Sequence, residues 1–284
     1  MTTLLQISDM HFGTEQPHVM QALEALSHAK KPDVLVVSGD ITQRAMPAQF
    51  AQARAFCDRL GAAQMLAVPG NHDIPLFNLF ARIVHPYAAY RKAFGQALEQ
   101  HLQTASLSVT TVNTTRWWRH KNGQVSEAQI DRVCKKLSDA NAQQLRVVVV
   151  HQPVHVLRPE DEHDRLNGWH AAVDAWSAAG ADIVMGGHIH LPYVCELSSQ
   201  VKGLARRMWC VQAGTAVSSR IRREAPNSVN VVEFETDTDT DTDTDTDTQA
   251  GRLGCNVERW DYQKEKSGGR FILVSTTALA LQRD

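Results

Sequence analysis

The sequence predicts an α/β protein: a four-layer α/β/β/α sandwich of two mixed β-sheets that pack face to face and are flanked by helices. Three observations lead to this prediction. Strand-like and helix-like segments alternate over the first two-thirds of the 284 residues, strand-like runs dominate after about residue 190, and polar side chains follow five apolar runs. Such alternation is typical of layered α/β domains. Because composition does not shift along the chain, we expect residues 1–284 to form a single domain.

The alternating part contains short apolar runs that suit buried strands. Strands are expected at residues 3–7, 33–38, 65–68, 107–113, 145–150 and 182–186. Helical periodicity lies between them, at residues 18–30, 47–60, 86–101, 126–139 and 168–179. The fourth of these helices has a start signal, because Ser126 and Gln129 have the spacing of a capping box before an apolar face.

The last third contains mainly strand-like runs, which are expected at residues 191–198, 207–213, 228–235, 252–262 and 270–276. We expect these late strands to form a second sheet that packs against the first. One segment breaks the pattern, because Thr236–Thr248 alternates seven Thr with six Asp and neither face of such a strand would be apolar. A disordered loop between two late strands is the expected state of this tract.

Composition excludes several classes of protein. The chain is 43% hydrophobic and 21% charged, and its net charge of −2 argues against a dedicated nucleic-acid or membrane-surface protein. The N-terminus lacks the basic and apolar regions of a signal peptide, and the longest aliphatic run, Val147–Val150, is too short to span a bilayer. Five scattered cysteines without a C-x-x-C pair favour a reducing compartment. We therefore expect a cytoplasmic protein.

Side chains that bind metal ions follow five of the apolar runs at once. They are Asp9 and His11, then Asp40, then Asn71 with His72 and Asp73, then His151, and finally His188 with His190. In open α/β sheets, ligands bind at the carboxyl ends of the strands, so these side chains should converge. Their number exceeds what one ion needs and suits two divalent ions about 3.5–4 Å apart. Glycines within the same blocks (Gly39, Gly70, Gly186 and Gly187) allow the backbone to approach the ions closely.

Taken in order from residue 9 to residue 190, the blocks "DMH", "GD", "GNHD", a His after a valine strand, and "GHIH" resemble the motif set of the calcineurin-like metallophosphoesterases. The resemblance implies two divalent metal ions, and Mn, Fe, Zn, Ni and Co are all compatible with the ligands. It implies that one ion is held by Asp9, His11 and His190, the other by Asn71, His151 and His188, with Asp40 bridging both.

The resemblance also implies a mechanism, in which a hydroxide shared by the two ions attacks phosphorus in line. His72 would contact the phosphate or, as an imidazolium, protonate the leaving group. Asp73 is expected either to orient His72 or to cap the segment that follows it.

A finer resemblance suggests the substrate. Residues 78–95 look like the helical insertion of class III cyclic-nucleotide phosphodiesterases, here expected at about residues 76–102, and residues 212–235 resemble a later region of that group. The expected reaction is hydrolysis of a small phosphodiester, with 3′,5′-cAMP preferred. Nucleic-acid ends, a nucleotide-linked lipid, a glycerophosphodiester, a phosphomonoester and a non-catalytic scaffold are the alternatives. The near-neutral charge weighs against long polyanions, and the lack of amphipathic membrane segments weighs against a lipid and against membrane binding.

Two basic segments have open roles. Arg116–Lys121 interleaves cations with two tryptophans, which suits base stacking, packing on the body or contact with a second copy in a homodimer. The cations of Arg220–Arg223 would either touch a phosphate-bearing substrate or remain solvated. Three histidines after the His151 block, His155, His163 and His170, are expected to be solvated unless one of them reaches the substrate.

Overall fold

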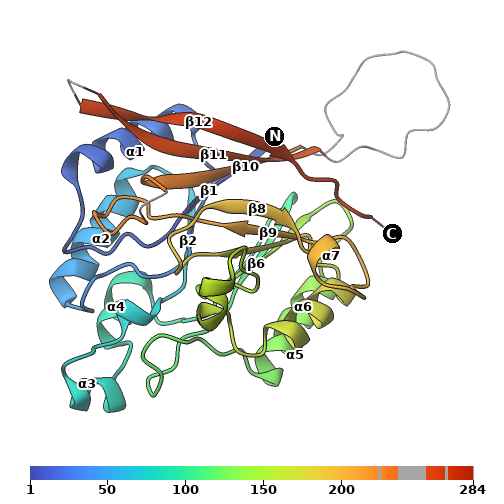
Figure 1. Ribbon diagram of the computed structural model, residues 1–284, viewed down its shortest axis with the longest axis horizontal. Helices are drawn as coiled ribbons and strands as arrows, with labels where there is room; N and C mark the ends of the chain where they lie inside the picture. Colours follow the sequence, from blue (N-terminus) through green and yellow to red (C-terminus); the bar gives the residue numbers. More distant parts are fainter. Residues whose placement is uncertain (223–224, 236–253, 266–267, 284) are drawn as a thin grey trace.

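Two β-sheets pack against each other in the computed structural model, which describes residues 1–222, 225–235, 254–265 and 268–283 (Figure 1). The Thr-Asp tract, predicted to be a disordered loop at Thr236–Thr248, lies outside the described residues. That residues 1–284 form one domain stays a prediction.

The first sheet has six strands within the described residues, in the spatial order β12-β11-β10-β1-β2-β3. They are β1 (Thr2–Ile7), β2 (Val34–Val37), β3 (Gln64–Ala67), β10 (Ser228–Glu235), β11 (Gly254–Glu265) and β12 (Gly268–Ala278). β1, β2 and β3 run parallel, whereas β10 is antiparallel to β1. The sheet is therefore mixed, and the carboxyl ends of its three N-terminal strands share one edge.

The second sheet also has six strands in the part of the chain described, in the order β4-β5-β6-β7-β9-β8. They are β4 (His101–Gln103), β5 (Leu107–Thr111), β6 (Leu145–Val149), β7 (Ile183–Gly186), β8 (Tyr193–Glu196) and β9 (Trp209–Gln212). β5, β6, β7 and β9 run parallel, and the outer strands β4 and β8 are antiparallel to their neighbours.

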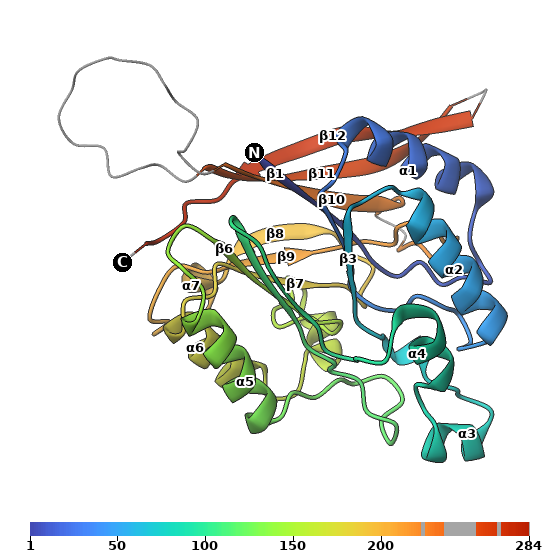
Figure 2. The same ribbon diagram turned by 180° about the vertical axis from the view of Figure 1, so that it is seen from behind.

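Helices cover the outer face of each sheet, as Figures 1 and 2 show from opposite sides. The helices are α1 (Pro17–Lys30), α2 (Pro47–Arg59), α3 (Leu79–Val84), α4 (Ala88–Phe94), α5 (Glu127–Ser138), α6 (Trp169–Ala178) and α7 (Leu197–Gln200). Of these, α3 lies away from both sheets, at one end of the molecule (Figure 1). α1, α2 and α4 share one apolar cluster with the first sheet, and α5 and α6 share another with the second. Among the described residues, each helix is too short or too polar to traverse a lipid bilayer.

Side-chain alternation along the strands explains why the layers form. Leu4 and Val36 of the first sheet share a buried cluster with Val147 of the second, whereas their neighbours Leu5 and Val37 face α1 and α2. Successive strand residues point to opposite faces, so a strand that is apolar at every position can be buried between a sheet and a helix layer. The predicted four-layer α/β/β/α sandwich is confirmed.

The prediction that the late strands form a sheet of their own is wrong. β8 and β9 extend the second sheet, and β10, β11 and β12 extend the first. β10 lies beside β1, where it pairs Asn230 with Gln6 and Phe234 with Thr2. Without β10, the apolar strand β1 would be an unpaired edge, so the late strands complete the two sheets that the first part of the chain begins.

The predicted helix at residues 86–101 is also wrong in its second half. α4 ends at Phe94, because Gly95 has a φ of +100° and leaves the helical conformation. The chain then enters β4, and α3 forms as a separate short helix before α4. The segment predicted as a helical insertion at 76–102 therefore contains two short helices and the start of a strand.

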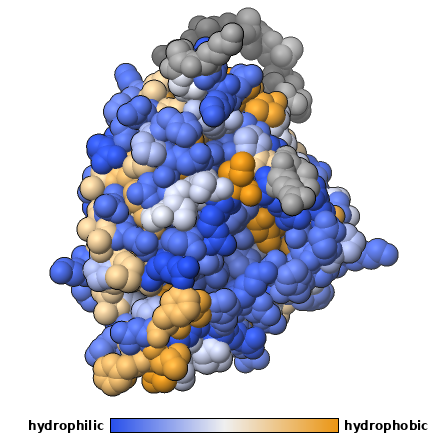
Figure 3. Space-filling model, turned by 60° about the vertical axis from the view of Figure 1, so that its left-hand side comes forward, coloured by the Kyte–Doolittle hydropathy of each residue, from blue (hydrophilic) through white to orange (hydrophobic). Residues whose placement is uncertain are grey.

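One local prediction in the helices is confirmed. Ser126 and Gln129 form the capping box at the start of α5. Tyr90 and Phe94 of α4 pack into the core, where the Tyr90 hydroxyl donates a 2.8 Å hydrogen bond to the Ala67 carbonyl. Near α3, by contrast, apolar side chains are exposed to solvent and gather at one end of the molecule (Figure 3).

Candidate metal centre

The predicted metal ligands meet where the two sheets present the carboxyl ends of their parallel strands. β1, β2 and β3 lead into Asp9 with His11, into Asp40, and into a 3₁₀ turn at Asn71–Asp73. β6 and β7 lead into His151 and into His188 with His190. Side chains that follow three of these strands, among them Asp40, Asn71 and His188, line one cleft of about 520 Å³. Asp9, His11 and His151, which follow the other two strands, are fully buried beside them.

The first group of ligands consists of Asp9, His11 and His190. His190 Nε2 lies 3.2 Å from Asp9 Oδ1 and 3.1 Å from His11 Nε2, and the distance from His11 Nε2 to Asp9 Oδ1 is 3.9 Å. Donor atoms about 2.1 Å from one ion lie at most about 4.2 Å apart. All three distances meet that condition, so the three side chains could hold one ion.

The second group consists of Asn71, His151 and His188. His151 Nε2 lies 3.3 Å from Asn71 Oδ1, and donor atoms of His151, His188 and Asp40 all lie within 4.8 Å of one another. Asp40 stands between the groups, since its Oδ1 is 3.4 Å from His151 Nε2 and its Oδ2 is 3.8 Å from His11 Nε2. This position suits the predicted bridging carboxylate.

The donor set fits a pair of divalent ions. Imidazole nitrogens, carboxylate oxygens and an amide oxygen are the ligands that such metals take in proteins. The glycine positions fit as well, because a Cβ on Gly187 would lie 2.6 Å from Asp9 Oδ2, and a Cβ on Gly70 would lie 2.1 Å from Asp40 Oδ1. Only glycine at these two positions leaves room for the carboxylates where they stand.

The backbone at the centre is strained in one consistent way. Seven non-glycine residues among those described have a left-handed φ, and five of them are predicted ligands. The five are Asp9 (50°), His11 (43°), Asp40 (46°), His188 (74°) and His190 (55°). Each such conformation costs on the order of 1–3 kcal/mol and persists only where the surroundings enforce it. Strain of this kind clusters at functional sites, which agrees with the placement of the donor atoms.

Hydrogen bonds to the backbone orient two of the imidazoles. His151 Nδ1 donates to the Ser38 carbonyl at 2.9 Å, and His190 Nδ1 donates to the Arg220 carbonyl at 2.6 Å. Each bond leaves Nε2 as the ring nitrogen that faces the clustered side chains. Such outer hydrogen bonds fix the tautomer of a metal-binding histidine. The backbone N–H of His188 also donates to Asp9 Oδ2 at 3.0 Å, which links the two sheets directly.

The charges of the cluster are strongly coupled. Burial raises the pKa of Asp9, but the charge and hydrogen bond of His190 outweigh burial and hold it at about 2. Burial lowers the pKa of His151, yet Asp40 and Asp9 raise it to about 9. For His11 burial prevails and lowers the pKa to about 3. In the absence of metal, protons on His151 therefore balance part of the carboxylate charge.

His72 lies beside the cluster, with its ring centroid 4.8 Å from that of His11. Its Nδ1 is 3.2 Å from the Gln43 carbonyl, and its Nε2 is 3.3 Å from Arg220 Nη1. Arginine can only donate, so Nε2 accepts from Arg220 and Nδ1 carries the proton. For His72 to donate a proton from Nε2, the Arg220 side chain must turn to another acceptor, and a phosphate oxygen would provide one.

Neither expectation for Asp73 matches the structure, because its carboxylate does not orient His72 and the helix that follows it, α3, is capped by Asn78. The carboxylate of Asp73 accepts hydrogen bonds from the backbone N–H groups of Gly70, Ile41 and Thr42 and from the Thr42 hydroxyl, at 2.8–3.0 Å. Burial raises the pKa of Asp73 to about 7, against the lowering effect of these bonds. Asp73 therefore ties the loop after β2 to the turn after β3 and makes no contact with the His72 ring in the structure described.

Three residues that line the cleft, Asp164, Lys121 and Arg220, were not singled out individually from the sequence. Asp164 Oδ1 lies 2.7 Å from Lys121 Nζ, with which it pairs, and 3.4 Å from His188 Nε2. Arg220, which the sequence placed only in a basic group, has its side chain next to His72 and its carbonyl on His190. The three side chains come from separate loops and carry no motif spacing that would have pointed to them.

The histidines predicted to be mostly solvated behave in different ways. His163 is exposed and lies 3.3 Å from Asp164, whereas His155 is buried and accepts a hydrogen bond from Arg165. Neither lines the cleft, and nor does His170; instead Asp161 and Asp164 of the same loop do so. The loop thus reaches the site through its carboxylates.

The segment Arg116–Lys121 serves more than one purpose. Arg116 donates to Gln129 of α5 and to the Thr115 carbonyl, which is the predicted packing role. Lys121 and His120 line the cleft, whereas Trp117 and Trp118 remain 40% and 58% exposed. Arg222 pairs with Asp161 at 3.0 Å, and Arg223 lies outside the described residues.

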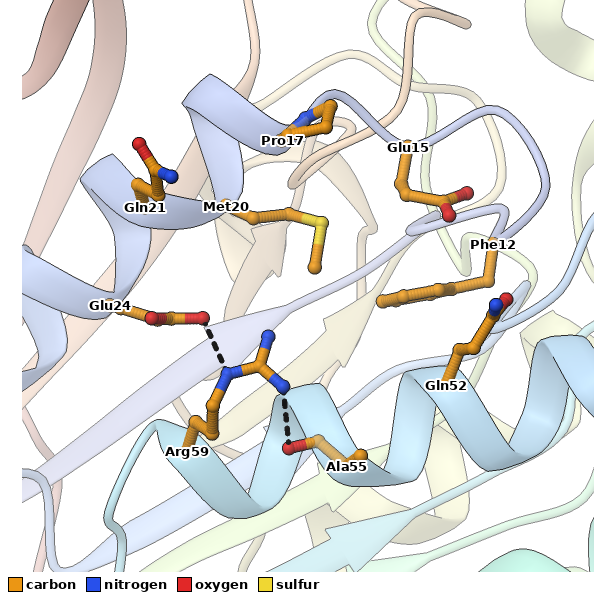
Figure 4. Close-up of a pocket in the computed structure, with 9 residues that line it drawn as sticks. All are labelled: Phe12, Glu15, Pro17, Met20, Gln21, Glu24, Gln52, Ala55 and Arg59. Atoms are coloured by element: carbon orange, nitrogen blue, oxygen red, sulfur yellow. Dashed lines mark hydrogen bonds and ion pairs between the residues drawn. The ribbon is translucent and has the colours of Figure 1, made fainter.

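A second cavity, of about 480 Å³, lies between α1 and α2 and is a contrast to the metal cleft (Figure 4). Its one cation, Arg59, pairs with Glu24 at 2.9 Å and donates to the Ala55 carbonyl. None of the clustered histidines or aspartates lines this cavity. Arg59 and Glu24 pair with each other, and Glu15 accepts a hydrogen bond from the Gly13 backbone N–H, so the cavity has no comparable cluster of metal-binding side chains.

Comparison with solved structures shows the same fold in known phosphatases. A dimetal phosphatase from Danio rerio is 13% identical over 99% of both chains, with a TM-score of 0.64. Purple acid phosphatase PPD1 from yellow lupin (Lupinus luteus) seeds is 12% identical, with a TM-score of 0.64, over 98% of this chain and 53% of its own. This chain therefore spans about half the length of the lupin protein. No curated protein matches the sequence.

The family model for calcineurin-like phosphoesterases matches residues 2–192, which include all the predicted ligands. This match covers well over half of the chain and supports metal-dependent hydrolysis of phosphoesters as the coarse function. The finer resemblance to class III cyclic-nucleotide phosphodiesterases stays a prediction. The chain belongs to the calcineurin-like phosphoesterase family.

Proposed function

We propose that the protein is a phosphodiesterase with a dinuclear metal centre, and that a 3′,5′-cyclic nucleotide, cAMP first, is its preferred substrate. The observation that carries the proposal is the position of Asp40 between two ligand groups, with Oδ1 3.4 Å from His151 Nε2 and Oδ2 3.8 Å from His11 Nε2. The metal-ligand roles of Asp9, His11, Asp40, Asn71, His151, His188 and His190 are part of this proposal. So are a cytoplasmic location and a small soluble substrate.

The residues of the chain prepare the site for an anionic ester. Divalent ions held there would supply an activated water and neutralise charge on the phosphate oxygens. Arg220 would bind a non-bridging oxygen of the phosphate, because Arg220 is the cation next to His72. Negative charge develops on the phosphate oxygens in the transition state, and a cationic donor stabilises it. His72 would then be released from Arg220 and could carry the proton that the departing alcohol needs.

The ligand groups alone do not select a diester, so other substrates remain alternatives. The same centre would serve a phosphomonoester, a nucleic-acid end, a nucleotide-linked lipid or a glycerophosphodiester. A non-catalytic scaffold is the least favoured alternative, because the full ligand set and His72 are present. The nearly neutral chain also suits small substrates better than long polyanions.

A substrate panel on the Mn-loaded protein tests the proposal. The panel compares 3′,5′-cAMP, bis-p-nitrophenyl phosphate, p-nitrophenyl phosphate and a short single-stranded DNA, with Asp40→Ala as the blank. We expect cAMP to be hydrolysed with a kcat/KM equal to or above that of the artificial diester. Hydrolysis of the artificial diester alone would retain the chemistry and reject the cyclic nucleotide, and hydrolysis of the monoester alone would reject a diesterase.

The role of His72 can be tested with leaving groups of different basicity. His72→Ala should lower kcat by about 10²–10⁴ for a diester with an alkyl alcohol as leaving group. The loss should be much smaller for a p-nitrophenyl ester, because p-nitrophenolate leaves without a proton. Equal losses for both esters would show that His72 does not act as the acid.

A further inference from the structure

A large apolar cavity lies next to the metal cleft, at the α3 end of the molecule. Its volume is about 780 Å³, within the range of small-molecule sites, and Met46, Leu76, Phe77 and Phe80 are among its walls. Phe77 and Phe80 are 75% and 74% exposed. Figure 3 shows hydrophobic surface gathered at this end, where Figure 1 places α3.

A small connecting hollow of about 190 Å³ adjoins both the metal cleft and the apolar cavity and shares lining residues with each. Asn71 and His72 line both the metal cleft and this hollow. Arg44 and Leu76 line both the hollow and the apolar cavity. A molecule could therefore lie across all three with one end among the metal ligands and the other among the aromatic side chains.

From the metal cleft through the connecting hollow to the apolar cavity, the lining changes from cationic to mainly apolar side chains. Arg220 and Arg44 line the connecting hollow, so two cations stand between the metal cleft and the apolar cavity. The Arg44 guanidinium lies 5.0 Å from the Phe77 ring centroid, and the walls beyond it are mainly apolar. Asp73 also borders the cavity, but its carboxylate is fully engaged by backbone donors.

We propose that this cavity binds the apolar alkyl group of a phosphodiester whose phosphate lies at the metal centre. The protein would then act on phosphodiesters with a sizeable alkyl substituent in addition to any cyclic nucleotide. A nucleobase suits the cavity less well, because its walls offer mostly apolar surface and a base requires hydrogen-bond partners. The inference concerns the substrate class of the metal centre, and so it rests on the proposed function for its chemistry.

Alkyl p-nitrophenyl phosphates of increasing chain length, used below their micelle concentrations, test the proposal on the Mn-loaded protein. Burial of each methylene should raise kcat/KM roughly fourfold until the cavity is filled. We expect the octyl ester to exceed the methyl ester by at least about 30-fold. In the Phe77→Gln/Phe80→Gln variant the ratio should fall towards one. Both side chains are largely exposed, so the variant should fold, which its melting temperature checks.

Leu273→Gln is the matched control, because Leu273 is a 46% exposed apolar residue on β12, at the far end of the molecule from α3 (Figure 1). This variant should keep the wild-type ratio. Equal rates for the methyl and octyl esters in the wild type, or an octyl preference that survives in the double variant, would overturn the proposal. A wild-type dimer that the double variant dissociates, without any effect of chain length, would overturn it in favour of an interface between copies.

Binding of octyl phosphate and methyl phosphate to the metal-free protein, measured by isothermal titration calorimetry, separates this inference from the proposed function. We expect tighter binding of octyl phosphate to the wild type and loss of that difference in the Phe77→Gln/Phe80→Gln variant. If no ester is hydrolysed but this difference is found, the proposed function fails and the alkyl site stands. If esters are hydrolysed and the difference is absent, only the alkyl site fails.

Discussion

The metal centre and the apolar cavity are neighbours, yet they hold their side chains in opposite ways. Asp9, His11 and His151 are fully buried, and backbone hydrogen bonds fix the neighbouring imidazole of His190. Phe77 and Phe80 are three-quarters exposed and depend on no such bonds. Ligand atoms must be in place before a metal or a substrate arrives, whereas apolar recognition requires only surface that can be removed from water.

The two regions also differ in how the chain builds them. The predicted ligands of the centre come from five strand ends in both sheets. Their charges set one another's pKa values, so a substitution at one of them changes the pKa of the others. The cavity comes almost wholly from residues 44–92, a local stretch around α3 and α4. Substitutions should therefore have large, shared effects at the centre and small, separate effects elsewhere.

The largest effect is expected from Asp40→Asn, which keeps the shape of the side chain and removes its charge. Asp40 is the carboxylate between the two ligand groups, so the variant should lose at least one ion and about 10³-fold or more in kcat/KM. Metal content by mass spectrometry and initial rates measure both effects. Asp58→Asn, an exposed residue in a pair with Arg54, is the control for a lost charge. An Asp40→Asn protein with two ions would refute the bridging role.

Metal affinity should rise steeply with pH. The pKa of His151 is raised to about 9 in the metal-free protein, but only the neutral imidazole can bind a metal. Binding must therefore displace a proton below pH 9, and the affinity should increase up to about tenfold per pH unit between pH 7 and 9. Calorimetry in two buffers of different ionisation enthalpy measures the protons released. An affinity that does not vary over this range would contradict the coupling.

A smaller effect is expected from Arg220→Gln, which removes the cation beside His72 and leaves the carbonyl that orients His190. We expect kcat/KM to fall by about 10–100-fold, in the range for loss of one charged hydrogen bond to a reacting group. Metal content should stay at the wild-type level, which separates this role from that of a ligand. Arg59→Gln, in the cavity between α1 and α2, should change neither quantity. Loss of metal in Arg220→Gln would show a structural role instead.

The smallest effect is expected from replacing Thr236–Thr248 with a short turn. Glu235 and Gly254 are paired neighbours on β10 and β11, so the flanking strands can be joined by a shorter connection. Phe234 pairs with Thr2 at the start of β1, and the metal ligands follow the other end of that strand. Activity and metal content should therefore stay within about twofold of the wild type. A large loss of either would place the tract in the site.

The sequence predicted the layers and the ligand cluster well because both follow from local patterns. Apolar runs of strand length and the polar residue after each run are visible in any single sequence, and the parallel strands bring these positions together. The sheet to which β8–β12 belong was not visible, because a late strand with the same pattern of side chains can extend the edge of either sheet.

Residues that act through tertiary contacts were the ones missed. Asp164, Lys121 and Arg220 reach the cleft from three loops whose paths depend on packing. The expected link between Asp73 and His72 failed for a related reason. Adjacent side chains in a 3₁₀ turn point in different directions, so Asp73 faces the loop after β2 while His72 faces Arg220.

The left-handed backbone of the ligand loops has a consequence for how such sequences change over time. Asp, Asn and His are the non-glycine residues that adopt this conformation most readily, whereas branched apolar residues strongly resist it. Backbone geometry therefore favours the residue types found at Asp9, His11, Asp40, His188 and His190, in addition to the metal binding proposed for them. A descendant that abandoned catalysis would still be steered towards Asn, Asp, His or Gly at these five positions. Parts of the motif can thus be retained after the activity is lost. Asn71 and His151 have no left-handed backbone to maintain, so they are the positions where loss of activity would first allow other residues.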